Sequence, residues 1–149
     1  MKTVMYVVVG MCATVAVATA VASPASPGRS AKTTKLTAFM TVNQSIPTPK
    51  GARGSGTFTA TVSGRTIRWR MTFRGMTGVV GAAHIHSALA GKANPAPAVT
   101  LCGPCKSGQS GTATAPAAVL RKILGGATYV NLHTAKNAAG EIRGQIASS

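Results

Sequence analysis

The stretch TIRWRMTFR, residues 66–74, decides the fold of this chain. Its side chains alternate between apolar and polar from one end to the other. One face receives the apolar side chains of Ile67, Trp69, Met71 and Phe73, and the opposite face receives Arg68, Arg70 and Arg74. Because successive side chains of a β-strand point to opposite faces, this period of two predicts a half-buried antiparallel strand with a basic outer stripe.

Shorter alternating segments lie on both sides of this strand. In TFTATV, residues 57–62, apolar residues alternate with threonines, and the following Ser-Gly-Arg predicts a tight turn into residue 66. In residues 36–42, Leu36, Ala38, Met40 and Val42 alternate with Thr37, Phe39 and Thr41. Further short strands are expected in AAHIHSA (82–88), APAVTLC (96–102), TYVNLHT (128–134) and GEIRGQI (140–146), the last two forming a hairpin around AKNAAG. We expect KSGQSGTATA, residues 106–115, to be a loop with one edge strand at most.

The one helical signal is PAAVLRKILGG, residues 116–126. Pro116 suits the first helical position, and Gly125 or Gly126 suits the C-terminal stop. Its predicted apolar stripe consists of Val119, Leu120, Ile123 and Leu124. Many short strands with one short helix predict an all-β fold, an antiparallel, Greek-key-like β-sandwich or barrel.

The N-terminal residues are expected to lie outside this fold. Residues 1–22 begin with a single lysine, continue as an apolar run and end in Ala-Val-Ala, the layout of a cleaved secretory signal peptide. The alternative is an uncleaved membrane anchor, since the run nearly reaches spanning length. Residues 23–35 are polar and contain proline, which predicts a flexible linker. The β domain would then occupy residues 36–149 of a secreted protein.

The sequence is strongly basic, with 16 lysines and arginines and one acidic residue, Glu141. Loss of residues 1–22 removes Lys2 and lowers the net charge from +15 to +14. Such a protein is attracted to polyanions outside the cell, such as wall or matrix polymers, with Arg68, Arg70 and Arg74 as the leading contacts. Export and the scarcity of aromatic residues argue against nucleic acid as the partner. The alternative is a solvated basic surface without a specific partner.

Three segments carry a resemblance to a known family. They are His84-Ile85-His86, Tyr129-Val130-Asn131-Leu132-His133-Thr134, and the closing Gly-Glu-Ile-Arg-Gly-Gln at residues 140–145. In this order they resemble the CHRD domain, the module named for chordin and also found singly in secreted bacterial proteins. The likeness covers about residues 36–146. It implies an extracellular β-sandwich-like module and implies little about activity. The loop after His86 departs from the family pattern, with Ser-Ala-Leu where glycine is usual.

The three histidines belong to non-core faces of their strands. His84 and His86 flank Ile85, and His133 alternates with Val130 and Leu132. If the two strands are neighbours, the imidazoles meet in one patch that suits copper or zinc, with an open position for water. The alternative is a structural role, in which the rings bond to loop carbonyls or pack under the loop of residues 87–97. The net positive charge favours that alternative. A complete copper/zinc superoxide dismutase site is excluded, because it needs more histidines and an aspartate.

Glu141 is expected either to hold the terminal hairpin through an ion pair or to accept a hydrogen bond from a metal-binding histidine and so fix its tautomer. Asn131 and Arg143, on the strands of the same hairpin, are expected to support this region structurally. A single carboxylate excludes glycosidase and aspartic-protease chemistry, which need two. We therefore expect a binding or structural module in preference to an enzyme.

Cys102 and Cys105 are the two cysteines that remain once Cys12 leaves with the signal peptide. Their sequence, CGPC, is also that of thioredoxin-type active sites, but that chemistry requires a helix to begin at the first cysteine. Two glycines and no helical period follow here. The sequence therefore predicts a small structural disulfide, with thiol–disulfide exchange as the alternative.

Overall fold

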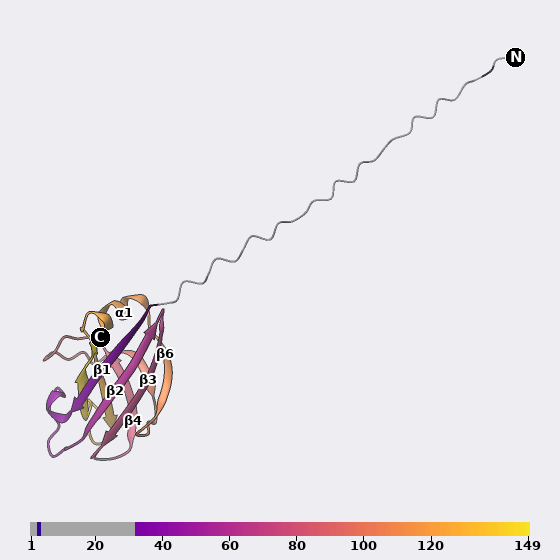
Figure 1. Ribbon diagram of the computed structural model, residues 1–149. Helices are drawn as coiled ribbons and strands as arrows, with labels where there is room; N and C mark the ends of the chain where they lie inside the picture. Colours follow the sequence, from indigo (N-terminus) through magenta and orange to yellow (C-terminus); the bar gives the residue numbers. More distant parts are fainter. Residues whose placement is uncertain (1–2, 4–31) are drawn as a thin grey trace.

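The computed structural model describes Thr3 and residues 32–149. The predicted signal peptide and residues 23–31 of the predicted linker lie outside this range, apart from Thr3. The described chain forms one sheet in the order β5-β4-β7-β8-β1-β2-β3-β6, with β9 also paired to β1. Every ladder is antiparallel, and the sheet curls into a nearly closed barrel (Figure 1). The predicted all-β class with one short helix is confirmed.

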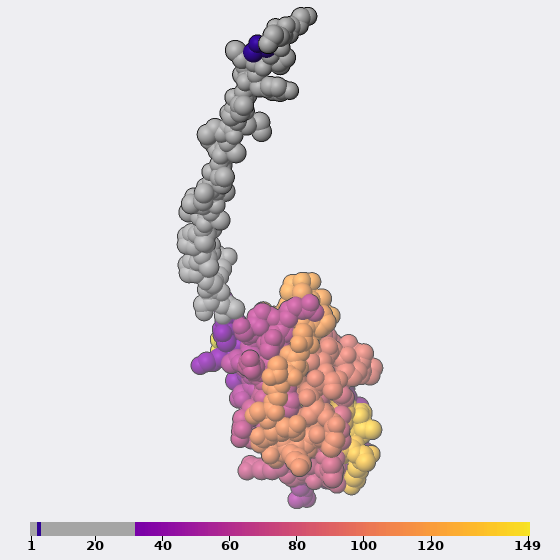
Figure 2. Space-filling model, turned by 90° about the vertical axis from the view of Figure 1, so that its right-hand side faces the viewer, coloured from indigo at the N-terminus to yellow at the C-terminus, as the bar shows by residue number. Residues whose placement is uncertain are grey.

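One half of the barrel is built from β1 (Thr33–Thr41), β2 (Ser55–Ser63), β3 (Thr66–Arg74) and β6 (Ser110–Thr114). The β2–β3 hairpin turns at Gly64, whose φ of 57° is a conformation that favours glycine. β6 pairs with β3 and ends the strand order, so it is the edge strand that the sequence allowed. Figure 2 looks onto this edge, where β6, in orange, lies against the magenta of β3.

The other half consists of β5 (Pro97–Cys102), β4 (Val80–His86), β7 (Tyr129–Thr134) and β8 (Ile142–Gln145). It joins the first half where β8 pairs with β1 at Thr41 and Arg143. The short strand β9 (Ala147–Ser148) also pairs with β1. A 3-10 turn, η1 (Val42–Gln44), follows β1.

The core fills the inside of the barrel with the apolar side chains that alternate along the strands. Phe58 of β2 faces Met71 of β3 in the register, and both are buried. Truncation of a buried phenylalanine to alanine costs about 3–5 kcal/mol, so this pair is a major part of the stability. Trp69 pairs with Gly111, where an added Cβ would lie 2.5 Å from the indole ring, so only glycine lets β6 approach β3 here.

The helix α1 (Ala117–Leu124) lies at one end of the barrel (Figure 1). Pro116 occupies the N-cap, one position earlier than expected, and Gly125 is the C-cap. Leu120 and Ile123 are buried, as predicted, but Leu124, the last residue of the helix, is 43 % exposed. Within the described range, no helix has the length and apolar character needed to cross a membrane.

One boundary differs from the sequence prediction. β1 begins at Thr33 and not at Leu36, so three residues of the expected linker belong to the sheet. They pair with the end of β2, from Thr33 opposite Ser63 to Lys35 opposite Thr61. Backbone pairing therefore extends the strand beyond its first buried side chain.

Candidate metal centre

The sheet topology places the two histidine-bearing strands side by side. In the β4–β7 ladder, Ala82 lies opposite His133 and His84 lies opposite Asn131. His84, His86 and His133 therefore meet on the outer face of the barrel. The alternation predicted that they point away from the core, and the pairing of β4 with β7 fulfils the condition for their meeting. One nitrogen from each ring lies within 4.8 Å of the other two.

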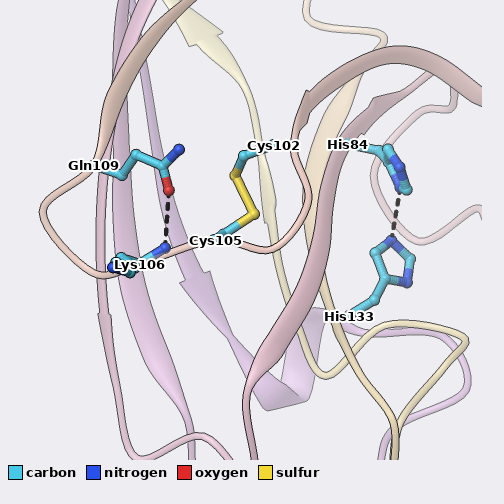
Figure 3. Close-up of a disulfide and its surroundings, with 6 residues drawn as sticks. All are labelled: His84, Cys102, Cys105, Lys106, Gln109 and His133. Carbon is cyan, nitrogen blue, oxygen red and sulfur yellow. Dashed lines mark hydrogen bonds between the residues drawn. A yellow bond between two sulfur atoms is a disulfide. The ribbon is translucent and has the colours of Figure 1, made fainter.

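The closest pair is His84 and His133, whose rings point toward one another (Figure 3). Nδ1 of His84 lies 3.3 Å from Nε2 of His133. Two nitrogens bound to one tetrahedral ion at about 2.0 Å are separated by about 3.3 Å, so this pair already has the spacing of two metal ligands. The same distance allows a hydrogen bond between neutral rings, with Nδ1 of His84 as the donor.

Backbone carbonyls fix the tautomers of His86 and His133. Nδ1 of His86 lies 2.9 Å from the carbonyl oxygen of Asn94, and Nδ1 of His133 lies 2.9 Å from that of Ala138. Because a carbonyl can only accept, both Nδ1 atoms carry the proton, and each Nε2 atom of the neutral rings has a lone pair that can bind a metal ion. The bonds to loop carbonyls that suggested a structural role are thus also the outer contacts that orient metal-binding histidines.

His86 is the most enclosed of the three. Its side chain is 2 % exposed, and its Nε2 is buried without a hydrogen-bond partner in the described part of the chain. An unpaired buried acceptor costs about 1–3 kcal/mol, which a bond to a metal ion would offset. The ring stacks on Tyr129, with ring centres 5.0 Å apart and planes 7° from parallel.

Asn94 holds the loop after β4 over His86. Its carbonyl accepts from His86 and also from the Tyr129 hydroxyl, at 2.9 Å. Its side chain donates to the carbonyl of Ser87 and accepts from the amide of Ala96. The loop of residues 87–96 is therefore tied to β4 and β7 at a single asparagine.

Burial and repulsion from neighbouring imidazoles lower the pKa of His84 and of His86. Burial lowers the pKa of His84, and the charge of His133 lowers it further. Burial also lowers the pKa of His86, although the hydrogen bond to Asn94 partly opposes the shift. Metal ions compete with protons for imidazole nitrogens, so a lowered pKa favours metal binding at mildly acidic pH.

The histidines form the floor of an open cavity of about 600 Å³. Its walls are small and mostly apolar, from Val79, Ala82, Pro95, Pro97, Ala135 and Ala138. Neither a lysine, an arginine nor a carboxylate belongs to this lining. An ion held by the imidazoles would face solvent through this cavity.

Glu141 is buried, and its partners differ from those expected. Oε1 accepts from the amide of Thr77 at 2.7 Å, and Oε2 accepts from the hydroxyls of Thr77 and Thr134 at 2.6 Å each and from Asn137 at 2.9 Å. These neutral donors replace the predicted ion pair, and the histidine tautomers are fixed by carbonyls instead. Burial raises the pKa of Glu141, but the four hydrogen bonds outweigh it and hold the pKa below its ordinary value. Glu141 therefore ties the segment before β4 to the β7–β8 connection.

Asn131 and Arg143 support the centre from β7 and β8. The Asn131 amide donates to the carbonyl of Ala139 and fills the space where Gly140 lacks a Cβ. Gly140 has a φ of 119°, so glycine is required both for its backbone conformation and for this contact. The guanidinium of Arg143 lies 3.6 Å from the centre of the Tyr129 ring, whose neighbour on β4 is His86.

The disulfide between Cys102 and Cys105 is formed, with the Cα atoms 5.5 Å apart. Cys102 pairs with Ala83 and Cys105 with Val80, so the bridge ties the end of β5 to β4 (Figure 3). Both cysteines belong to the hydrophobic core, whereas the histidines occupy the outer face of β4 and β7. The next helix begins only at residue 117, so the arrangement is that of a structural clip.

The predicted basic stripe lies in the other half of the barrel. Arg68, Arg70 and Arg74 are exposed on the outer face of β3, and the structure does not bring them near the histidines. Sequence reasoning missed Asn94, Tyr129 and Ala138 as supports of the histidines. Asn-Pro at residues 94–95 was a visible turn signal, but the partners of a turn cannot be read from its residues.

Comparison with known proteins identifies a family and nothing narrower. The family model of the CHRD domain matches residues 36–146. Neither a curated protein nor a solved structure matches the chain. CHRD domains are extracellular modules, and a formed disulfide fits an oxidising compartment. Since the match runs from the first buried residue of β1 to the last core residue, Ile146, and takes in all three histidines, the chain belongs to the CHRD domain family.

Proposed function

We propose that this CHRD domain is a non-enzymatic extracellular module that binds one copper or zinc ion. The ligands are Nδ1 of His84, Nε2 of His86 and Nε2 of His133. The observation that carries the proposal is the convergence of three imidazole nitrogens within 4.8 Å, with two of the rings already oriented by carbonyls. Copper is the preferred ion, because imidazole ligands suit both metals and divalent copper binds more tightly than zinc in a given site.

The net positive charge of the protein opposes the binding of a metal cation less than the magnitude of that charge suggests. The cavity above the histidines is lined without lysine or arginine, so the surrounding cations act across solvent. Exposed charges are largely screened beyond about 8 Å at physiological ionic strength. The local donor geometry therefore outweighs the long-range repulsion.

Calorimetric titration of the metal-free protein with copper and with zinc tests this function. We expect one-to-one binding that His84→Ala or His133→Ala weakens by more than about 100-fold, since each removes a direct ligand and even an outer-shell loss costs about 10–100-fold. Arg68→Ala, on the opposite half of the barrel, is the control and should bind as the unmodified protein does. Weak binding that is indifferent to both histidine variants would leave the histidines with a structural role.

A second observation supports association with anionic wall or matrix polymers. An open groove of about 620 Å³ crosses the outer face of β1, β2, β3 and β6. Lys35, Arg68 and Arg70 line it together with hydroxyl groups from Thr37, Thr59, Thr61, Ser110 and Thr112. The only acidic side chain of the chain is buried beside β7, so no acidic side chain neutralises these cations. We propose that Arg68 and Arg70 in this groove, with Arg74 farther along the outer face of β3, are the main contacts of an anionic chain.

Elution from an immobilised sulfated polysaccharide tests whether retention depends on the outer face of β3 or on net charge alone. Replacing Arg68, Arg70 and Arg74 by glutamine should lower the salt concentration needed for elution. Replacing three exposed lysines of other loops, Lys50, Lys92 and Lys136, changes the net charge by the same amount and should have a smaller effect. Equal shifts for both triple variants would assign the retention to net charge and not to the groove.

We also propose that residues 1–22 are removed on export. Cleavage after Ala22 would leave Ser23 as the first residue. The mass of the protein recovered from the culture medium tests this directly. An intact N-terminus in a membrane fraction would favour the anchor alternative.

A further inference from the structure

We propose that the metal in the three-histidine site takes a small monovalent anion as its exogenous ligand. This inference rests on the proposed metal-binding function and specifies the chemistry of the same site. It is argued from the donor count, the charge of the donors and the walls of the cavity above them.

The protein supplies three donors and leaves at least one coordination position to a ligand from solution. Within the described residues, the group that can hold an ion consists of His84, His86 and His133. Zinc commonly takes four ligands, and divalent copper four or more. The remaining position faces the open cavity, because the backbone of β4 and β7 lies behind the rings.

The donors leave the charge of the ion uncompensated. All three are neutral imidazoles, so a bound divalent ion keeps its charge of two. The carboxylate of Glu141, the only acidic side chain of the chain, accepts hydrogen bonds from Thr77, Thr134 and Asn137 instead of turning toward the histidines. An anion from solution therefore stabilises the loaded site more than a neutral ligand does. The net charge of +15 also steers anions toward the protein.

The walls select the kind of anion. Val79, Ala82, Pro95, Pro97, Ala135 and Ala138 offer the cavity small apolar side chains. Thr134 also lines it, but its hydroxyl hydrogen is committed to Glu141. Phosphate and sulfate carry several oxygens that need hydrogen-bond donors when they leave water, and these walls provide few. A diatomic or linear monovalent anion places its charge on the metal and the rest of the molecule against apolar groups.

Azide added to the copper-loaded protein provides the test. Calorimetry first establishes one copper ion per chain, and the visible spectrum is then followed as azide is added. We expect a saturable azide-to-copper charge-transfer band with one azide per copper. Phosphate and sulfate at the same ionic strength should displace azide only at concentrations about tenfold higher or more, because they lose hydrogen bonds in the cavity.

A matched pair of variants tests the charge argument. Ala135→Glu places a carboxylate at the wall, where it either occupies the open position or neutralises the ion. The affinity for azide should then fall by about tenfold or more, while Ala135→Gln, of nearly the same size, should leave it almost unchanged. Both variants should still bind one copper ion, because Ala135 lies outside the donor set.

The outcomes separate the two proposals. Copper binding without any spectral response to azide would overturn this inference and leave the metal-binding function standing. Equal losses in the glutamate and glutamine variants would also overturn it, because bulk and not charge would then be responsible. Absence of copper binding would overturn the proposed function, and this inference with it.

Discussion

The two halves of the barrel use the same inner face and very different outer faces. Along β1, β2 and β3, most apolar side chains point inward, and the outer face carries mainly exposed threonines and basic side chains together with Phe39, which is 63 % exposed. Along β4, β7 and β8, the outward side chains are also polar, yet His86, Asn131 and Arg143 are buried. Arg68 is exposed and Arg143 is 3 % exposed, although both point away from the barrel core.

The difference comes from the loops and not from the strands. The β2–β3 connection is a two-residue turn, whereas the loop of residues 87–96 and the β7–β8 connection fold back over their strands. Their carbonyls then accept hydrogen bonds from His86 and His133. A polar outer face becomes a second interior once a loop covers it, and there each polar group needs a specific partner.

Gly140→Ala should cause the largest loss of stability. It changes a residue of the covered half, the part of the barrel built from β4, β5, β7 and β8, whose outer face lies under loops. The added Cβ would overlap the Asn131 amide, and the φ of 119° is strained for alanine, so we expect a loss of about 3 kcal/mol in the free energy of unfolding. Gly64→Ala, in the open turn of the other half, has a φ of 57° and free space, so it should cost only about 1–2 kcal/mol. Urea unfolding measures both. Equal losses would show that the covered half is no more tightly constrained.

Copper should stabilise the covered half and, through it, the whole cooperative fold. At a free copper concentration about 100 times the dissociation constant, binding adds about 2.7 kcal/mol to the free energy of unfolding. Thermal unfolding with and without copper would show this as a higher midpoint. His84→Ala should abolish the shift and Arg68→Ala should retain it. A shift that survives His84→Ala would place the ion elsewhere.

Asn94→Ala should weaken metal binding without removing a ligand. The variant keeps the carbonyl that accepts from His86 but loses the side-chain bonds to Ser87 and Ala96 that hold the loop. We expect copper affinity to fall by about tenfold, the lower end for an outer contact of a metal site. Asn43→Ala, at an exposed asparagine, is the control in the same titration. Unchanged affinity in both would mean that the loop is held without Asn94.

The smallest of the expected effects is that of acid. As the pH falls, the free energy of unfolding should decrease in two steps, both caused by groups of the covered half. Burial lowers the pKa of His84 and His86 below about 6.5, so the unfolded chain binds protons first as the pH falls. The free energy of unfolding therefore declines from about pH 6.5 down through the lowered pKa values and then levels off. The stabilisation from Glu141 is present above about pH 4.3 and is lost as the pH falls through its lowered pKa. Urea unfolding at several pH values should show a smaller first step in His84→Ala, and an unchanged first step would contradict the assignment.

The strand pattern could be predicted where one face meets the core and the other meets solvent. TIRWRMTFR shows this alternation, and the burial of Ile67, Trp69 and Met71 follows it. The same argument placed the three histidines on non-core faces. Their meeting was conditional, because only the sheet order makes β4 and β7 neighbours.

Contacts between loops and strands could not be predicted in this way. Thr77 binds Glu141 across 64 positions of sequence, and no periodicity marks either residue as a partner of the other. The burial of His86 depends on where the following loop returns, which its composition does not specify. The covered half is therefore the part of the molecule where sequence patterns are least informative and where the candidate site lies.

The neutral partners of Glu141 give this protein an unusual relation to ionic strength. In most folds added salt weakens attractive ion pairs as well as repulsion between like charges. Here the single acidic side chain is held by hydroxyl, amide and backbone donors, while the many basic side chains repel one another. Screening therefore removes repulsion and has almost no attraction to remove. The free energy of unfolding of this protein should therefore be higher at high salt concentration than in dilute buffer.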